Sequence, residues 1–178
     1  MDLDNVNRPL VCCSKSLVML LRFLIVLIAF PNIASASSNN LIKRCEVFSI
    51  YDGDTLTAIC SKQKVKVRFN CIDTPEMKQK PWGQISRDHL RQITPKFVDL
   101  RVFTKDRYGR YVADVLVGTE NLNLKMVSDG YAAVYKKYCK TDSFFAAESD
   151  AKKNLKGIWQ KEGLHQSPWV WRKLKRDK

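Results

Sequence analysis

Residues 45–60 read CEVFSIYDGDTLTAIC, and this stretch has the pattern of a β-hairpin. Two runs rich in β-branched and aromatic residues, CEVFSIY and TLTAIC, flank the Asp-Gly-Asp of residues 52–54. An Asp-Gly pair between two such runs is a strong short-range signal for a tight hairpin turn. In this hairpin we expect Cys45 and Cys60 to lie opposite each other, within a register slip of a residue or two.

Further strands and helices are expected after this hairpin. A third strand continues the meander, a helix and two more strands follow, and two helices come last, over residues 64–70, 83–93, 97–103, 111–117, 121–129 and 143–157. Gly130 stands where a left-handed residue would end the second of these helices. Five short strands with helices between and after them predict an α+β fold, a five-stranded β-barrel of the OB type with three helices. The strand face and loops of such barrels often bind nucleic acid.

Residues 1–36 are expected to be a signal peptide rather than part of the fold. Basic residues precede the apolar run FLIVLIAF, and the small residues ASA that follow fit cleavage after Ala36. Met19 is an alternative start that gives a shorter and more ordinary signal peptide. An uncleaved membrane anchor over residues 17–36 is the competing interpretation, but Arg22 interrupts this span and leaves a run too short to cross a bilayer.

The rest of the sequence indicates one domain with a short lead and a tail. The whole chain has 178 residues, which gives room for one domain with a sizeable core. We expect residues 37–43 to be the lead, residues 44–160 to form the domain, and residues 161–178 to be an aromatic and basic tail along its surface. The basic residues of 172–178 are expected to be solvated and to add general attraction for a phosphate backbone.

The chain carries a large surplus of positive charge. It has 31 Lys and Arg against 18 Asp and Glu, which gives a formal charge of +13. Such a surplus favours an anionic partner, with nucleic acid and an anionic membrane as the leading candidates and a merely basic protein as the alternative. If the signal peptide is removed, no stable membrane association is expected.

Four cysteines remain after residues 1–36 are removed. They are Cys45, Cys60, Cys71 and Cys139, and an even number in an exported chain predicts two disulfides. Three pairings are open, and the hairpin favours Cys45 with Cys60, which leaves Cys71 for Cys139. A zinc site is the alternative, but the sequence has no C-x-x-C spacing and two histidines in all. The expected location is secreted or periplasmic.

Three loops of the predicted barrel combine acids with arginines. Asp52 and Asp54 lie in the first hairpin turn, the stretch VRFNCIDTPE (67–76) follows the third strand, and DRYGR (106–110) lies in a later turn. Each has a structural explanation by itself, since Asp-Gly-Asp favours tight turns and Asp-Thr-Pro can cap a helix.

Together these residues suit the hydrolysis of a phosphodiester. Carboxylate oxygens are hard ligands that bind calcium or magnesium without histidine or cysteine. A phosphodiester under attack gains negative charge, which a divalent cation and the planar forks of arginines stabilise. A carboxylate that stays off the metal can orient or deprotonate the attacking water. The three loops offer residues for each of these tasks.

The combination of motifs resembles one known family. The sequence is similar to the staphylococcal or micrococcal nucleases, also called thermonucleases, in four motifs that occur in the same order. These motifs are YDGDT (51–55), VRFNCIDTPE (67–76), DRYGR (106–110) and KGIW (156–159). The resemblance extends from about residue 44 to 159 in order and spacing. The ending SPWVWR also resembles that of many exported bacterial members.

The resemblance implies a site for one calcium ion and a residue that deprotonates or positions the attacking water. Asp54 and Asp73 would bind calcium through their carboxylates, and Thr74 through its backbone carbonyl. Glu76 would be the general base, or at least the residue that positions the attacking water.

The resemblance also implies a set of residues that contact the substrate. Arg68 and Arg110 would bind the scissile phosphate and its transition state, and Arg110 would favour departure of the leaving oxygen. Arg107 and Tyr108 would touch a terminal phosphate or sugar. Tyr135 is a candidate for base stacking, with core packing as the alternative, in a region four residues shorter than in the family.

The function predicted on this basis is that of a calcium-dependent endonuclease. It would hydrolyse DNA and RNA with little sequence preference, leave 3′-phosphate ends and act as a monomer. The alternative is a nuclease-like OB module that binds nucleic acid with weak catalysis or none, although such a module would be expected to have lost the acids. A form tethered to the membrane by an uncleaved N-terminus is a further possibility.

Overall fold

The computed structural model describes residues 40–177. The predicted signal peptide, its cleavage site and the alternative start at Met19 lie outside these residues. Among residues 40–177 no helix has both the length and the apolar character needed to span a bilayer.

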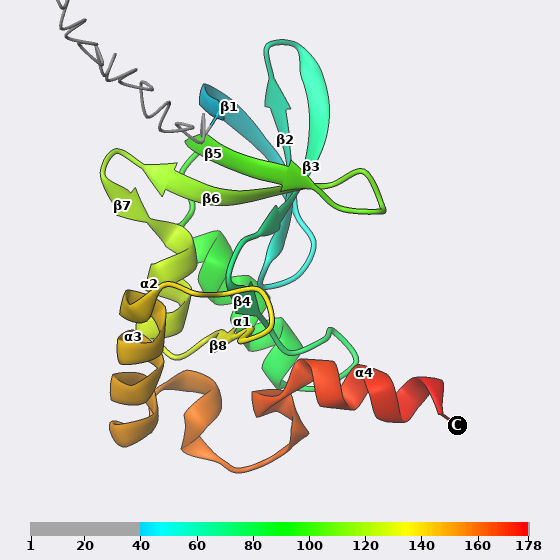
Figure 1. Cartoon of the computed structure of the whole chain (residues 1–178), viewed down its shortest axis with the longest axis vertical. Helices are drawn as coiled ribbons and strands as arrows, with labels where there is room; N and C mark the ends of the chain where they lie inside the picture. The colour runs from blue at the N-terminus through cyan, green and yellow to red at the C-terminus, as the bar shows by residue number, and fades with distance from the viewer. Residues whose placement is uncertain (1–39, 178) are drawn as a thin grey trace, which may run out of the picture. The chain divides into compact units, whose positions relative to one another are not determined.

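The described residues form eight strands, four α-helices and two short 3₁₀ helices (Figure 1). The strands are β1 (Asn40–Ile50), β2 (Thr55–Cys60), β3 (Gln63–Phe69), β4 (Ile72–Asp73), β5 (Phe97–Lys105), β6 (Tyr111–Val117), β7 (Glu120–Asn121) and β8 (Ala133–Val134). The helices are α1 (Trp82–Ile93), α2 (Leu122–Ser128), α3 (Asp142–Lys153) and α4 (Pro168–Arg176), with the 3₁₀ helices η1 (Gly157–Gln160) and η2 (Leu164–Gln166).

Five of these strands close into the barrel that the sequence predicts. They pair in the order β3-β2-β1-β5-β6, and β3 also pairs with β6 in parallel, from Val67↔Tyr111 to Phe69↔Ala113. The short β7 adds to β6 at the edge, and β4 and β8 form a separate pair. The α+β fold with a five-stranded OB-type barrel is thus confirmed. Because β1 begins at Asn40, residues 40–43 belong to the barrel and not to a lead.

The first hairpin forms in the predicted register. Glu46 lies opposite Ile59, and the adjacent pair Cys45–Cys60 is a disulfide. The second predicted disulfide, Cys71–Cys139, is also formed, across 68 positions of the sequence. Both predicted pairings are confirmed, and the second ties the segment after β3 to the segment before α3.

The turn of this hairpin packs against the element that follows β4. A Cβ atom at Gly53 would lie 2.8 Å from Cβ of Ser86 and 2.9 Å from Cβ of Thr74. Real side chains do not approach this closely, so a larger residue would push the turn away from α1. Glycine is therefore needed here for close approach, and it keeps Asp54 beside Thr74.

The core fills the barrel and continues under the helices. Leu56, Val67, Leu100 and Val115 are completely buried inside the barrel. Leu90 of α1, with Leu122 and Met126 of α2 and Phe144 of α3, extends the same cluster beyond the barrel end. Burying each large apolar side chain contributes about 1.5–3 kcal/mol, so this core holds the loops at the barrel end in fixed positions.

A buried amide fixes the chain where β3 ends. Asn123 of α2 donates from Nδ2 to the carbonyl oxygens of Asn70 and Ala113, at 3.0 Å each, and its Oδ1 accepts from the amide of Val115 at 3.0 Å. All three bonds connect α2 to β6 and to the residue after β3. The turn that leads to Asp73 is therefore held from below by a fully paired polar group.

The helices differ from the prediction in two places. The predicted helices 83–93 and 121–129 are present as α1 and α2, but α3 ends at Lys153 rather than at residue 157. The backbone turns left-handed at Leu155 (φ 48°) and Gly157 (φ 51°), which cannot continue a right-handed helix. The tail contains a fourth helix, α4, where the sequence analysis predicts three helices in all.

Candidate active site

All nine predicted site residues line one cleft of roughly 980 Å³. The cleft lies where the β1–β2 turn, the segment after β3 and the β5–β6 turn meet. The residues that it brings together are Asp54, Arg68, Asp73, Thr74, Glu76, Arg107, Tyr108, Arg110 and Tyr135. Helix α4, the last element of the chain, contributes a further side of the cleft.

Two buried carboxylates form the centre of the cleft. Asp54 follows the first turn and accepts hydrogen bonds at Oδ2 from the amide of Thr74 at 2.9 Å and from its hydroxyl at 3.1 Å. Asp73 is 1% exposed and lies in the short strand β4. Arg68 joins the two, since its Nη2 lies 2.9 Å from Asp73 Oδ1 and 3.2 Å from Asp54 Oδ2.

Burial, and after it the charge of a neighbouring acid, raises the pKa of Asp73 and of Asp52. Burial, with the negative charge of Asp54 as the second cause, raises the pKa of Asp73 to about 6. The same two causes, in the same order, raise the pKa of Asp52 to about 7. Asp52 also accepts at Oδ1 from the amide of Asp54 at 3.1 Å, so it belongs to the cluster although no role is predicted for it from the sequence. Three acids this close favour a bound positive charge.

The oxygens at this centre fit a calcium-type cation. Within residues 40–177 no three His, Cys, Asp or Glu side chains are arranged as a metal-binding group. The carboxylates of Asp54 and Asp73 are oxygen donors, and calcium binds such donors together with backbone carbonyl oxygen and water. Two guanidinium groups, from Arg68 and Arg172, already place positive charge on these oxygens. The oxygen donors of this centre are of the kind that calcium prefers, and in this structure the two guanidinium groups pair with them.

The β5–β6 turn presents the second predicted arginine. Asp106 accepts at Oδ1 from the amides of Tyr108 and Arg110, and at Oδ2 from Arg110 Nε at 2.7 Å. These bonds fix the turn and the direction of the Arg110 guanidinium. Arg107 donates from Nη2 to the hydroxyl of Tyr108 at 2.6 Å, and the Tyr108 side chain is 68% exposed at the rim.

Tyr135 lies in the wall of the cleft and is packed on one side. Its ring stacks on Trp169 with the centroids 5.6 Å apart and the planes at 9°. Tyr138 meets the edge of Tyr135 at 4.9 Å and is itself exposed. Tyr135 thus packs on Trp169 at the wall of the cleft and not in the hydrophobic core, and its role in base stacking stays a prediction.

The residue that sequence reasoning missed is Arg172. Its Nη1 and Nη2 donate to Asp73 Oδ1 at 3.1 Å and to Asp73 Oδ2 at 2.8 Å, and Nη1 also donates to Glu76 Oε1 at 2.7 Å. The prediction that residues 172–178 are a solvated segment is wrong at this position, because the Arg172 side chain is 35% exposed and lies in α4.

A helical pattern in the tail could have revealed this residue. Trp169, Arg172 and Arg176 are spaced by three and then four positions, which places them on one face of a helix. All three line the cleft in the structure. Pro168 at the first turn and Ser167 before it also fit a helix start.

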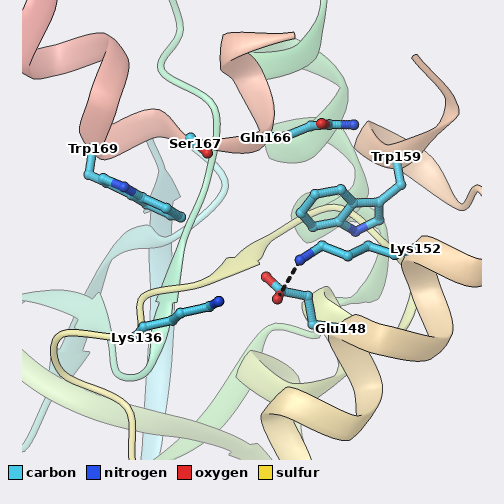
Figure 2. A pocket seen from close by; sticks show the side chains of 7 residues that line it. All are labelled: Lys136, Glu148, Lys152, Trp159, Gln166, Ser167 and Trp169. Carbon is cyan, nitrogen blue, oxygen red and sulfur yellow. Dashed lines mark hydrogen bonds and ion pairs between the residues drawn. The ribbon is translucent and has the colours of Figure 1, made fainter. Parts of the chain in front are cut away.

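A second, smaller pocket lies beside the start of α4 (Figure 2). Its volume is roughly 280 Å³, and Figure 2 shows the indole of Trp169 at one side and Lys152 close to Glu148 at the other. The buried Glu148 accepts from the amide of Val134 at 2.8 Å and from Lys152 Nζ at 2.7 Å. These contacts fix β8 to α3 and give Glu148 and Lys152 of this pocket structural partners.

Comparisons with known proteins agree with the resemblance that the sequence motifs show. The family model described as "Staphylococcal nuclease homologue" matches residues 66–161, more than half of the chain. An "Uncharacterized endonuclease" of Escherichia coli is 33% identical over 131 residues, which cover 72% of this chain and 84% of the relative. A "Micrococcal nuclease" of Shigella flexneri is 33% identical over 147 residues, covering 75% and 83%. An "Uncharacterized endonuclease" of Haemophilus influenzae is 39% identical over 117 residues, covering 65% of each chain.

The closed barrel and its cleft of carboxylates and arginines define a nuclease with an OB-type fold. This chain belongs to the staphylococcal nuclease family.

Proposed function

We propose that this nuclease is a calcium-dependent endonuclease that hydrolyses DNA and RNA with little sequence preference and leaves 3′-phosphate ends. The observation that carries the proposal is the cleft in which Asp54, Asp73 and Glu76 lie together with Arg68 and Arg110. Family membership supports the hydrolysis of nucleic acid, and the oxygen-rich centre of the cleft supports the choice of metal.

The two buried carboxylates are the proposed metal ligands. Asp54 and Asp73 would hold the ion, with the backbone carbonyl of Thr74 as a further oxygen. The bonds from Thr74 to Asp54 fix these groups relative to each other before any ion binds. When bound, calcium supplies positive charge that stabilises the negative charge developing on the phosphate.

Glu76 is the proposed base for the attacking water. Its carboxylate lies on the same segment as Asp73 and is about one third exposed, so it borders both the buried centre and the solvent. The backbone of Glu76 is fixed by a hydrogen bond from its amide to Gln79 Oε1 at 2.9 Å. A carboxylate in this position can orient a water molecule and accept its proton.

Arg68 and Arg110 are proposed to bind the phosphate from two sides. Arg68 extends from β3 at the centre of the cleft, and Arg110 is directed by Asp106 at its wall. Planar guanidinium groups can each donate two hydrogen bonds to phosphate oxygens. These bonds stabilise the phosphate most as negative charge develops on its oxygens. Both would act on the transition state more than on the bound substrate.

The wider cleft suits a substrate that is read through its backbone. Arg107, the exposed Tyr108 and Tyr135 border it and are proposed to contact phosphate, sugar or a base face. Contacts of this type carry little sequence information, so low selectivity follows. The protein is proposed to act as a monomer, secreted or periplasmic after signal-peptide removal, and its two disulfides support an oxidising compartment.

The ends of the products test this proposal. Oligonucleotides of DNA and of RNA, labelled at the 5′ end, are incubated with the protein and calcium, and the products are separated before and after treatment with a 3′-phosphatase. We expect cleavage of both substrates, and a change in product mobility after phosphatase treatment. Products with 3′-hydroxyl ends, or binding without cleavage, would show that the proposed reaction is wrong.

A further inference from the structure

Arg172 lies against two carboxylates of the cleft. Its guanidinium donates to both oxygens of Asp73 and to one oxygen of Glu76, at distances of 2.7 to 3.1 Å. One arginine of the tail therefore engages a proposed metal ligand and the proposed base together. Asp73 and Arg172 are separated by 99 positions in the sequence, so this contact depends on how the tail folds back.

The contact leaves Asp73 with few free acceptor positions. A carboxylate offers about four lone pairs, and Asp73 already accepts two bonds from Arg172 and one from Arg68. A divalent cation bound to the same carboxylate would also lie next to the Arg172 guanidinium. Two positive charges this close repel each other, and more strongly beside the buried Asp73 than in bulk water. Calcium and Arg172 therefore compete for Asp73.

Helix α4 can release Arg172 without disturbing the core. Pro168 at its first turn is buried and Trp169 stacks on Tyr135, whereas Val170 and Leu174 are exposed. Figure 1 shows α4, in red, as the last element of the chain, and Figure 2 shows Trp169 at its start facing the small pocket. The helix is thus attached at its beginning, while the part from Arg172 onward is held mainly by the ion pairs.

We infer that Arg172 is a tethered cation that closes the active site when calcium is absent and that calcium must displace to bind. This inference rests on the proposed function and adds its regulation. With Arg172 in place, the charge of Asp73 is paired and one oxygen of Glu76 is occupied by the same guanidinium. The arginine thereby raises the calcium concentration at which the site is filled, and the nuclease remains inactive below it.

Calcium affinity, measured by isothermal titration calorimetry without substrate, tests this inference. The purified protein is compared with Arg172→Met, Arg172→Lys and Lys173→Met. The last removes one positive charge from an exposed position of the same helix and controls for general electrostatics. We expect Arg172→Met to bind calcium at least about fivefold more tightly than Lys173→Met, in the range of ordinary coupling between sites. Arg172→Lys should lie between, because it retains the charge without the planar fork.

Hydrogen exchange gives a second result that does not depend on a variant. Because linkage is reciprocal, calcium should weaken the docking of α4 as much as α4 weakens calcium binding. The backbone amides after Trp169 in α4 should therefore exchange faster when calcium is added to the unmodified protein.

The outcomes separate this inference from the proposed function. Equal calcium affinity in Arg172→Met and Lys173→Met, or weaker binding in Arg172→Met, would show that Arg172 does not compete with calcium. The proposed calcium site would be unaffected by that result. Slower hydrogen exchange in α4 with calcium would also show that the inference is wrong, since Arg172 would then stabilise the calcium-bound site. If neither the unmodified protein nor any variant binds calcium, both the inference and the proposed cofactor are wrong.

Discussion

Replacing Arg68 by lysine is expected to lower kcat/KM for DNA cleavage by about 10²- to 10³-fold, or about 2.7–4 kcal/mol of transition-state stabilisation. Arg68 lies at the centre of the cleft, where its Nη2 contacts Asp54 and Asp73 and its Nη1 donates to the carbonyl oxygen of Phe69 at 2.9 Å. These bonds fix the plane of the guanidinium before the substrate arrives. Lysine retains the charge but cannot offer two parallel donors to a phosphate. The loss of kcat/KM therefore measures the contribution of the planar guanidinium and not of the positive charge.

Arg101→Lys is the matched control for this experiment. Arg101 also extends from a barrel strand and approaches an aspartate, Asp114, at 3.8 Å, but it does not line the cleft. Initial rates on a labelled oligonucleotide, with thermal unfolding to verify the fold, compare the two variants. If Arg68→Lys cleaves as fast as Arg101→Lys, then Arg68 does not act on the transition state.

Replacing Glu76 by glutamine is expected to lower kcat by about 10²- to 10⁴-fold, the usual contribution of a general base. Glutamine has the same shape but cannot accept a proton from water, so substrate affinity should change little. Its side-chain oxygen can still accept the bond that Arg172 now donates to Glu76. Steady-state rates over a range of DNA concentrations separate kcat from KM, and the deficit should lie in kcat.

Glu162→Gln provides the comparison, because it makes the same chemical change at an exposed residue outside the cleft. The assignment of Glu76 as base predicts unchanged kinetics for Glu162→Gln. Should Glu76→Gln retain more than about one tenth of the activity, the water must be activated by another group.

The barrel could be predicted because its signals are local. The alternating pattern of residues 45–60 with an Asp-Gly pair specifies the first hairpin, and this register brings Cys45 opposite Cys60. The second disulfide then follows for the part of the chain after the predicted signal peptide, where Cys71 and Cys139 are the two cysteines left. The acids and arginines of the site also lie in three short motifs, so their convergence follows once the barrel closes.

The contribution of α4 could not be predicted in the same way. Its contact with the site depends on packing between residues far apart in the sequence, such as Trp169 on Tyr135. A basic run at a chain end is usually solvated. This general rule predicts no contact with the site, although Trp169, Arg172 and Arg176 have the spacing of one helix face. Likewise, the need for Gly53 comes from its contact with α1 and Thr74 and not from the turn itself.

The most direct test of calcium-dependent hydrolysis at this site is cleavage of a fluorescent DNA oligonucleotide by the purified protein, first with calcium and then with an excess of chelator. The proposed site predicts cleavage with calcium, loss of cleavage when the ion is removed, and recovery when calcium is added back. Without the ion, the site lacks the positive charge that stabilises the phosphate as negative charge develops on it. Cleavage at an unchanged rate in the chelator would contradict the account.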